Sequence, residues 1–366
     1  MSVLPHETAL ALATGSLYLT APNPHVGCVI VDKLGCILGQ GHTQRAGGPH
    51  AEVMALRNAA ANNRDVRGAT AYVTLEPCSH HGRTGPCCDI LIAAGIKKVV
   101  ASIADPNPMV SGQGFGRLRA AGVEVEVGAG AAESRELNIG FFSRMIRKTP
   151  WVRMKVAASL DGTTALENGQ SQWITGDAAR ADGHAWRARA CAVLTGIGTV
   201  LEDNPRLDVR LVATPRQPHA VVVDSRMDTP LDANLFMSGR TLLIYAAVEN
   251  NAKREGLESR GATVVVMPGA NGKVDLAAMM RDLGQREINE LHVEAGSKLN
   301  GSLIREGLVD EYLLYLAPML LGPGPGLAAL APLSELTQSV KLAFKSTQMI
   351  GADLRVIARG AGRDQF

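Results

Sequence analysis

A histidine, a glutamate and two cysteines in the first quarter of the chain have the residue types and spacing of a metal-dependent hydrolytic site. His50 and Glu52 begin a segment with helical spacing, Cys78 follows a strand-like segment, and eight residues separate Cys78 from Cys87. One imidazole and two thiolates give three ligands for a tetrahedral zinc ion and leave the fourth position for water. Zinc lowers the pKa of that water toward 7, so that a hydroxide can attack an amidine-like ring carbon. The pattern predicts a zinc deaminase.

Glu52 is predicted to carry protons and not to bind the metal. It would take a proton from the water and deliver it to the ring nitrogen and the departing amine. The alternatives are a helix-capping His50, a solvated Glu52 and cysteines that are merely buried. A structural zinc site is a further alternative, against which the lack of a fourth ligand at finger spacing counts. His80 and His81, between the two cysteines, are candidates for the substrate side of the pocket.

Composition and charge narrow the class of protein. Of 366 residues, 46% are hydrophobic, 20% charged and 4% aromatic, and 37 Lys and Arg nearly balance 35 Asp and Glu. No long run of like charge occurs, so we expect neither nucleic acid nor a membrane surface as a partner. The N-terminus lacks a secretory pattern, and the longest apolar run is shorter than the roughly 20 residues of a membrane helix. We therefore expect a soluble, cytoplasmic protein whose six cysteines form no disulfides.

Two successive α/β series suggest two domains, which the chain length also favours. In the first series, helices are expected at 7–19, 50–61, 88–94 and 115–121, and strands at 26–31, 36–39, 71–75, 99–103 and 123–127. This order predicts a three-layer α/β domain in which several strands are parallel. A charge-rich helix is expected at 131–148. Thr149-Pro150 ends it, because proline disfavours helix in the preceding residue, and the domain boundary is placed there.

The second series has strands expected at 151–157, 192–195, 220–223, 241–245, 263–266, 291–293 and 311–316, and helices at 177–189 and 276–286. It carries no Gly-x-Gly-x-x-Gly after a strand, so a Rossmann fingerprint is absent. Glycine turns at 196–199 and at 296–302, the second leading into a helix, are compatible with phosphate binding, because such turns present amide groups to anions. A plain strand-to-helix turn at Gly296 is the alternative.

Short segments spread over nearly the whole chain resemble a single enzyme family. In the first half these are Asn23-Pro24-His25-Val26-Gly27, His50-Ala51-Glu52, Thr74-Leu75-Glu76-Pro77-Cys78 and Asp105-Pro106-Asn107-Pro108. In the second half they are Ala158-Ser159-Leu160-Asp161-Gly162, Ser171-Gln172-Trp173-Ile174-Thr175, Asp203-Asn204-Pro205 and Val293-Glu294-Ala295-Gly296. With these segments and its long loop between the cysteines, the chain is similar to the bifunctional deaminase–reductases of riboflavin biosynthesis, the RibD type.

The resemblance implies a fold and a two-step reaction. Residues 1–148 would form a cytidine-deaminase-like three-layer α/β/α domain, and residues 149–366 a dihydrofolate-reductase-like α/β domain. With Zn²⁺, the first would hydrolytically deaminate 2,5-diamino-6-(5-phosphoribosylamino)pyrimidin-4(3H)-one. With NADPH, the second would reduce the ribosyl group of the resulting 5-amino-6-(5-phosphoribosylamino)uracil to ribityl. The expected partner is thus a small phosphoribosylated pyrimidine, and a homo-oligomer is left open.

The resemblance also implies contacts for each ligand. The deaminase pocket would be lined by Asn23, His42, Arg83, Asp105 and Asn107, and Lys155 would reach across toward the phosphate bound there. NADPH would contact Ala157, Trp173, Thr199, Asp203, Ser225, Gly296, Ser297, Lys298, Leu299, Asn300, Gly301 and Ser302. The substrate of the reductase would contact Ser171, Arg187, Leu207, Arg210 and Glu294.

Several of these residues have ordinary structural alternatives. Asn23-Pro24 and Asp105-Pro106 are also turn initiators. Arg187 and Arg210 suit a phosphate clamp, because a guanidinium offers paired donors, although Arg187 could also be a solvated helix residue. Trp173 suits a pocket wall or a core position equally well.

Two other classes of protein compete with this interpretation. A nucleic-acid or nucleoside deaminase fused to an unrelated domain is disfavoured, because polynucleotide binding uses a surplus of lysine and arginine. A binding module that keeps the fold without catalysis is disfavoured by the complete set of His50, Glu52, Cys78 and Cys87.

Overall fold

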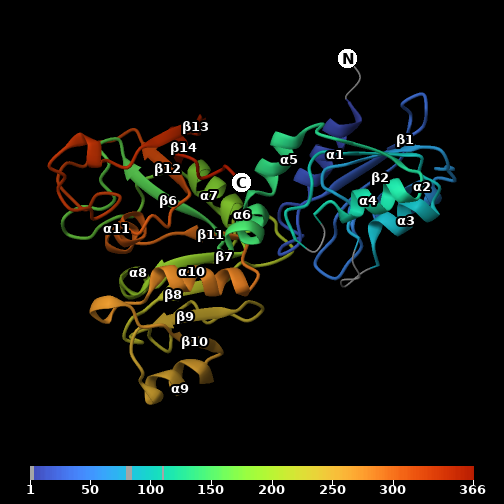
Figure 1. The fold of residues 1–366 in the computed structure, drawn as a ribbon. Helices are drawn as coiled ribbons and strands as arrows, with labels where there is room; N and C mark the ends of the chain where they lie inside the picture. Colours follow the sequence, from blue (N-terminus) through green and yellow to red (C-terminus); the bar gives the residue numbers. More distant parts are fainter. Residues whose placement is uncertain (1–3, 80–84, 109–110) are drawn as a thin grey trace. The chain divides into compact units, whose positions relative to one another are not determined.

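The computed structural model describes residues 4–79, 85–108 and 111–366. Contacts divide the chain into two compact units, Met1–Lys148 and Thr149–Phe366 (Figure 1). The division follows a helix whose C-cap, Lys148, has left-handed backbone angles. No helix in the described ranges is both long and apolar enough to cross a bilayer.

The first unit is built on a five-stranded sheet in the order β2-β1-β3-β4-β5. Its strands are β1 (Gly27–Val31), β2 (Ile37–His42), β3 (Thr70–Val73), β4 (Lys98–Ala101) and β5 (Glu124–Val127). β1 is antiparallel to β2 and β3, whereas β3, β4 and β5 are parallel. The helices are α1 (Pro5–Thr14), α2 (Ala51–Ala61), α3 (Cys87–Ala93), α4 (Gln113–Ala120), α5 (Ala131–Leu137) and α6 (Ile139–Arg147).

Glycines in β1 and β2 allow helices to pack closely on both faces of this sheet. A Cβ at Gly27 would collide with the backbone of Ala9 in α1, and a Cβ at Gly41 would collide with α2 at Ala55. Gly41 pairs with Cys28, and successive residues of a strand point to opposite faces. Helices α1 and α2 therefore cover opposite faces, which confirms the predicted three-layer α/β/α arrangement.

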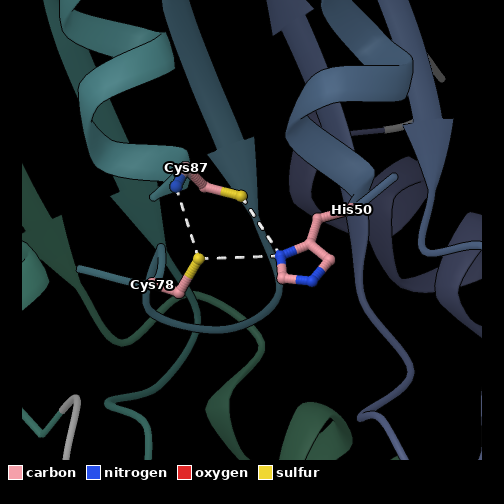
Figure 2. A group of neighbouring side chains, drawn as sticks. All are labelled: His50, Cys78 and Cys87. Atoms are coloured by element: carbon pink, nitrogen blue, oxygen red, sulfur yellow. Dashed lines mark hydrogen bonds between the residues drawn. The ribbon is translucent and has the colours of Figure 1, made fainter. Parts of the chain in front are cut away.

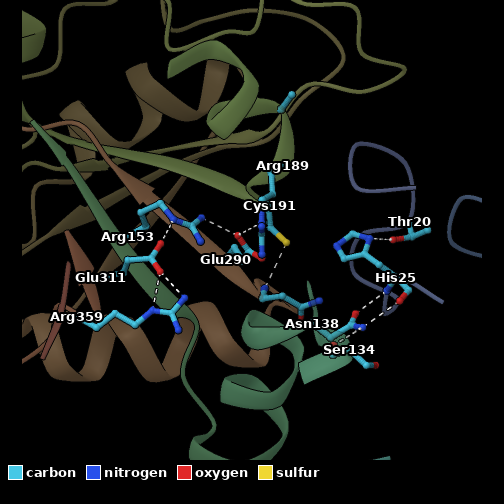
Figure 3. A network of polar contacts seen from close by, with 12 residues as sticks. Thr20, His25, Ser134, Asn138, Arg153, Arg189, Cys191, Glu290, Glu311 and Arg359 are labelled. Carbon is cyan, nitrogen blue, oxygen red and sulfur yellow. Dashed lines mark hydrogen bonds and ion pairs between the residues drawn. The ribbon is translucent and has the colours of Figure 1, made fainter. Parts of the chain in front are cut away.

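The single helix predicted at 131–148 is wrong, because two helices occupy this range. Asn138 separates α5 from α6 and has φ −108° and ψ 20°. Its side chain accepts a hydrogen bond from the backbone N–H of His25 at 2.7 Å and donates one to the carbonyl of His25 at 2.9 Å (Figure 3). The break thus coincides with a tertiary contact to a residue 113 positions away, which the local pattern does not reveal.

The second unit is built on a nine-stranded sheet in the order β10-β9-β8-β7-β11-β6-β12-β14-β13. The strands are β6 (Trp151–Ser159), β7 (Ala192–Gly196), β8 (His219–Val223), β9 (Leu242–Ala246), β10 (Ala262–Val266), β11 (Glu290–Val293), β12 (Glu311–Ala317), β13 (Leu342–Ile350) and β14 (Asp353–Gly360). β10 through β12 in this order are parallel, and β14 and β13 are added antiparallel at one edge.

Five α-helices accompany this sheet in the described part of the second unit: α7 (Asp177–Arg189), α8 (Ile197–Asp203), α9 (Asn251–Ser259), α10 (Leu276–Gln285) and α11 (Ser297–Arg305). The core is mainly aliphatic, as the low aromatic content predicts. Val193, Val222 and Ile244 of three neighbouring strands pack with Leu257 of α9. Aliphatic residues on adjacent parallel strands thus supply the surface on which the helices pack.

A network of buried ion pairs joins strands of the second unit (Figure 3). Arg153 of β6 donates hydrogen bonds to Glu311 of β12 and, at 2.7 Å, to Glu290 of β11. Arg189 of α7 reaches Glu290 at 2.9 Å, and Arg359 of β14 reaches Glu311 at 2.8 Å. Because each carboxylate bridges two guanidinium groups, the network ties four strands to α7.

Candidate active sites

His50, Cys78 and Cys87 converge in the first unit (Figure 2). His50 is the N-cap of α2, Cys87 is the first residue of α3, and Cys78 follows β3. Nδ1 of His50 lies 3.6 Å from Sγ of Cys78 and 3.3 Å from Sγ of Cys87, and the ligand atoms of all three lie within 4.8 Å of one another. Tetrahedral zinc, with bonds of about 2.3 Å to sulfur and about 2.0 Å to nitrogen, places such atoms about 3.5 Å apart. The three side chains therefore fit zinc.

The two thiols are electrostatically coupled. Hydrogen bonds from Cys87 and His50 lower the pKa of Cys78 to about 4. Sharing that hydrogen bond, together with burial, raises the pKa of Cys87. The backbone N–H of Cys87 also donates to Sγ of Cys78 at 3.3 Å. The pair favours one thiolate and one thiol, and a metal ion would displace the remaining proton.

Glu52 lies in the first turn of α2 and is 3% exposed. Burial raises the pKa of its carboxyl, and the negative charge of Cys78 adds to the effect, whereas His50 opposes it. A carboxyl whose pKa is raised holds a transferred proton more readily, which suits a group that carries protons. The solvated surface position that was the alternative for Glu52 is excluded.

Two residues expected on the substrate side of the first unit, Asn23 and His42, lie in or near loops. Asn23 stands in a turn, where its N–H donates to the carbonyl of Thr20 at 2.9 Å. His42 ends β2, and its Nδ1 lies 3.1 Å from the carbonyl of Thr43. Arg83, together with His80 and His81, lies outside the described residues.

Asp105 and Asn107 form a turn that follows β4. The backbone N–H of Asn107 donates to Oδ1 of Asp105 at 2.8 Å. Burial raises the pKa of Asp105 to about 7, and the charges of Glu76 and Cys78 act in the same direction. The backbone N–H of Asp105 donates to Oε2 of Glu76 at 3.2 Å. The turn is thus bonded to Glu76, a residue of the Thr-Leu-Glu-Pro-Cys segment to which the sequence assigned no role.

A second polar cluster lies in the second unit around Glu294, which follows β11. Arg187 of α7 donates to both carboxylate oxygens of Glu294, at 2.5 and 2.8 Å, and its Nη1 donates to the carbonyl of Asp208 at 2.9 Å. Burial alone would raise the pKa of Glu294, but the charge and hydrogen bonds of Arg187 hold it well below its ordinary value. Arg187 is therefore committed to Glu294, and the solvated position is excluded.

Lys155 of β6 belongs to the same cluster. Its Nζ lies 5.8 Å from the centre of the Tyr315 ring. Burial lowers the pKa of Lys155, and the positive charge of Arg187 lowers it further, whereas the negative charge of Glu294 raises it. These neighbours all belong to the second unit.

Arg210 borders this cluster on the side of Asp208. Its Nη1 donates to Oδ1 of Asp208 at 2.7 Å, and its backbone N–H donates to Nδ1 of His184 at 3.2 Å. Burial, with the charges of Arg187 and Arg210, lowers the pKa of His184 to about 4, so the ring is neutral near pH 7. Sequence reasoning missed His184 and Asp208, because only the fold brings them beside the arginines. Leu207, between the charged residues, is buried with φ 50°.

The two glycine turns of the second unit meet after neighbouring strands. β7 and β11 are adjacent and parallel, so their carboxyl ends lie at the same edge of the sheet. A Cβ at Gly196 would lie 3.1 Å from the side chain of Leu299, and a Cβ at Gly296 would lie 3.8 Å from Oγ1 of Thr199. Gly296 is the N-cap of α11. Ligands of open α/β sheets gather at such an edge.

The predicted contacts inside α11 face different surroundings. Ser297, Lys298, Leu299 and Ser302 are partly or fully exposed, whereas Asn300 and Gly301 are buried. Nδ2 of Asn300 donates to the carbonyl of Leu327 at 2.9 Å, and a Cβ at Gly301 would collide with the backbone of Ala329. Asn300 and Gly301 therefore hold α11 against residues 327–329.

The remaining predicted cofactor and substrate residues are dispersed around the second sheet. Trp173 is 64% exposed, and the guanidinium of Arg180 lies 4.6 Å from its ring centre, so a core position for this tryptophan is wrong. Ser171 precedes it by two residues. Ala157 lies in β6, Asp203 ends α8, and Ser225 follows β8 with its carbonyl accepting from Ala247 at 3.0 Å.

Both halves of the chain match known protein families. Residues 5–103 match the cytidine and deoxycytidylate deaminase zinc-binding region, and residues 150–356 match the RibD C-terminal domain. The chain is 45% identical to the riboflavin biosynthesis protein RibD of Escherichia coli (strain K12), across 96% of this chain and 98% of that protein. The chain belongs to the RibD family. The RibD of Aquifex aeolicus is 40% identical, across 95% of each chain.

Solved structures of RibD proteins superpose over the full length. Acinetobacter baumannii RibD, form 1, has a TM-score of 0.88 at 38% identity and covers 98% of both chains. A diaminohydroxyphosphoribosylaminopyrimidine deaminase/5-amino-6-(5-phosphoribosylamino)uracil reductase from Thermotoga maritima has a TM-score of 0.86 at 32% identity, with the same coverage. These likenesses confirm the predicted fold, a cytidine-deaminase-like N-terminal domain and a dihydrofolate-reductase-like RibD C-terminal domain. RibD proteins are bifunctional deaminase–reductases of riboflavin biosynthesis, and this chain is an enzyme of that kind.

Proposed function

We propose that residues 1–148 deaminate 2,5-diamino-6-(5-phosphoribosylamino)pyrimidin-4(3H)-one, and that residues 149–366 reduce the ribosyl group of the product with NADPH. The observation that carries the first step is the convergence of His50, Cys78 and Cys87 beside the buried carboxyl of Glu52. Three protein ligands leave one position of a tetrahedral ion for a reacting group. The second step is supported by the family to which the C-terminal residues 150–356 belong.

In the deaminase, each residue of the chain has a separate task. His50, Cys78 and Cys87 would hold zinc, which when bound supplies a water of lowered pKa. Glu52 would take one proton from the attacking water and deliver it to the ring nitrogen, and would then take a second proton from the newly added hydroxyl group and deliver it to the departing amine. Asp105 and Asn107, with Asn23, His42 and Arg83, bind the polar edges and the phosphate of the substrate.

In the reductase, the protein positions two ligands and excludes water, while NADPH supplies the hydride. The turns at Gly196 and Gly296, with the cofactor residues named from the sequence, would hold NADPH at the carboxyl edge of β7 and β11. Arg210 would bind the phosphate of the substrate, and Glu294, oriented by Arg187, would bind its sugar. We assign Lys155 to this substrate as well, because Glu294 and Arg187 are among its described neighbours.

We also propose that the chain forms a homodimer through a surface at the edge of the second sheet, here called the β13 surface and comprising residues 319–349. Nine of the 20 exposed large hydrophobic residues in the described ranges belong to this run. Phe344 is 77% and Met349 59% exposed, and both pair with β14 residues that share one sheet face, Ala358 and Leu354. A stable interface takes about 20–30 residues from each partner, which a run of this length supplies.

The few charges on the β13 surface favour a second copy as its occupant. Between Leu320 and Met349 the charged residues are Glu335, Lys341 and Lys345, and Lys345 pairs with Asp364 at 2.6 Å. In a two-fold dimer the same patch meets itself, so a patch rich in one charge would repel its copy.

A cytoplasmic location remains a prediction that suits an enzyme using NADPH.

One assay with separate readouts tests the two activities. The full-length protein is incubated with the phosphoribosylated diaminopyrimidine, with and without NADPH, and ammonia release and nicotinamide absorbance are followed separately. Ammonia should appear without NADPH, and NADPH oxidation should depend on deamination or on added deaminated substrate. A strong chelator should stop ammonia release and spare NADPH oxidation with the deaminated substrate. Deamination of cytidine or deoxycytidylate in preference to the diaminopyrimidine would overturn the proposed substrate.

A further inference from the structure

The carboxylate of Glu76 is buried just beyond β3, and its hydrogen bonds lead to one neighbouring segment. Oε2 accepts the backbone N–H groups of Asp105, at 3.2 Å, and Gly112, at 2.9 Å. Oε1 accepts the backbone N–H of Phe115 at 3.2 Å. The side chain is 3% exposed, so these three donors replace the water that a carboxylate would otherwise bind.

The same carboxylate lies against the first turn of α4. Gly112, the N-cap of α4, has φ 80°, and Phe115 is the third residue of the helix. The positive end of the helix dipole and these free N–H groups stabilise a negative charge at this place. A Cβ at Gly114 would collide with the carbonyl of Pro77, so the helix and the segment leading to Cys78 pack in direct contact.

Glu76 thereby joins two parts of the proposed deaminase pocket. On one side it precedes the zinc ligand Cys78 by two residues. On the other it binds the backbone of Asp105, whose carboxylate in turn accepts the N–H of Asn107. The side chain of Glu76 thus links the 105–107 turn to the segment that leads to Cys78.

We propose that Glu76 is a positioning residue of the deaminase, which holds Asp105 and Asn107 where they bind the substrate beside the metal ligands. The proposal rests on the proposed deaminase function of the first unit. Glu76 itself contacts neither the substrate nor the metal. Its effect on turnover passes through the backbone N–H groups of Asp105, Gly112 and Phe115 that it accepts.

The chemistry of the contact makes Glu76→Gln a sharp probe. Glutamine keeps the size of the side chain but offers one acceptor oxygen, whereas the three N–H groups occupy both oxygens of the glutamate. In the variant an amide NH₂ must face at least one backbone N–H. Because a buried charge-assisted hydrogen bond is lost, we expect the KM for deamination to rise about tenfold or more. We expect kcat to fall less, since Glu52 and the metal ligands are untouched.

The experiment compares the full-length, zinc-loaded parent with Glu76→Gln and with the control Glu126→Gln, an exposed carboxylate of the same unit. Zinc content, KM and kcat for deamination, and the reductase rate with deaminated substrate are measured for each. The expected result is a raised deamination KM in Glu76→Gln alone, with zinc content and reductase rate preserved. An unchanged KM, or a loss of zinc that accounts for the whole defect, would overturn the proposal.

A double-variant comparison tests whether Glu76 acts through Asp105. If it does, Glu76→Gln combined with Asp105→Ala should raise KM little beyond Asp105→Ala alone. Fully multiplicative effects would overturn the proposal, and so would an unaltered KM in Asp105→Ala. Absence of deamination in the parent would instead overturn the proposed function.

A second variant approaches the same contact from the loop. Gly112→Ala forces a residue with a Cβ into φ 80° and moves its N–H away from Glu76 without changing the carboxylate. If Glu76→Gln does not fold, this variant should still show the raised KM at preserved zinc content. A normal KM in Gly112→Ala would then overturn the proposal.

Discussion

At the scale of single residues, each of the two proposed sites has a buried carboxyl group, and the pKa values of the two groups are shifted in opposite directions. Burial raises the pKa of Glu52, so its carboxyl can hold a proton that it must later release. Glu294 is also buried, but Arg187 holds its pKa well below the ordinary value, so it remains a carboxylate. One carboxyl is adapted to exchange protons and the other to keep a fixed charge.

Glu52→Gln should abolish most of the deaminase activity and leave the metal site intact. The amide keeps the hydrogen-bonding shape but cannot carry a proton, and general acid–base catalysis contributes roughly a hundred- to ten-thousand-fold in rate. Zinc content and NADPH oxidation with deaminated substrate should match the parent, as should all activities of Glu126→Gln. Deamination at the parent rate would show that Glu52 has no part in proton transfer.

The two arginines of the reductase cluster should behave differently. Arg210→Ala should weaken substrate binding by about 1.5–3 kcal/mol, the value of a hydrogen bond to a charged group, with little change in NADPH affinity. Arg187→Ala should in addition raise the pKa of Glu294, because the main opposing charge is removed from a buried carboxylate. The acid limb of the reductase pH profile should therefore move to higher pH in Arg187→Ala only. Identical pH profiles in both variants would show that Arg187 does not control the pKa of Glu294.

Lys155→Ala decides between the two pockets for which this lysine has been considered. Its neighbours in the second unit predict a raised KM, or a lost rate, for the reductase with supplied deaminated substrate. The KM for deamination should equal that of the parent. The reverse pattern would support the interaction with the deaminase phosphate that the family resemblance implies.

At the scale of elements, the ion network that joins β6, β11, β12 and β14 should make the second unit sensitive to acid. Burial alone would raise the pKa of Glu290, but the charges of Arg189 and Arg153 overcome it and lower the pKa to about 2, from an ordinary value of 4.5. A depressed folded-state pKa adds stability that is complete above the unfolded-state pKa and is lost as the pH falls toward the folded-state pKa.

Glu290→Gln should therefore lower the stability of the second unit near neutral pH, by about 3–5 kcal/mol, because it leaves two buried guanidinium groups short of a charge. The difference from the parent should be constant above about pH 5 and should shrink between pH 4.5 and about 2. Denaturant unfolding across this range is the measurement, and Glu258→Gln, an exposed carboxylate of the same unit, is the control. A difference that does not vary with pH would exclude charge as its cause.

The elements also show which features a sequence can reveal. Strands β6 through β12 are predicted because buried parallel strands are continuous apolar runs, and α7 is predicted with its observed ends. β13 is not predicted, because its residues from Leu342 to Met349 are all exposed and show no alternation of burial. The break at Asn138 is missed because it coincides with a distant partner, His25.

The residues of the proposed sites likewise differ in whether the sequence reveals them. His50, Cys78 and Cys87 are predictable because few residue types bind zinc, and their spacing is distinctive. Glu76 and His184 are not, since a glutamate or histidine acquires its role only from the tertiary neighbours that the fold supplies.

At the scale of the whole molecule, the β13 surface predicts the oligomeric state. Phe344→Glu places a charge on the most exposed aromatic side chain of that surface, where a two-fold partner would bring an identical charge close to it. Sedimentation should show a dimer for the parent and a monomer for the variant. Leu34→Glu, which alters an even more exposed leucine of the first unit, should stay dimeric. A monomeric parent would refute the proposed interface.

The close packing of α2 on β2 at Gly41 connects the spacing between helix and sheet with the geometry of the proposed deaminase site. Gly41 lies directly under Met54 and Ala55, one turn along α2 from His50 and Glu52. A methyl group at position 41 would push the N-terminal end of α2 away from the sheet. The metal ligand His50 and the proton carrier Glu52 would move together with that end. The distance between sheet and helix therefore determines where His50 and Glu52 stand. The absence of a side chain at position 41 sets that distance.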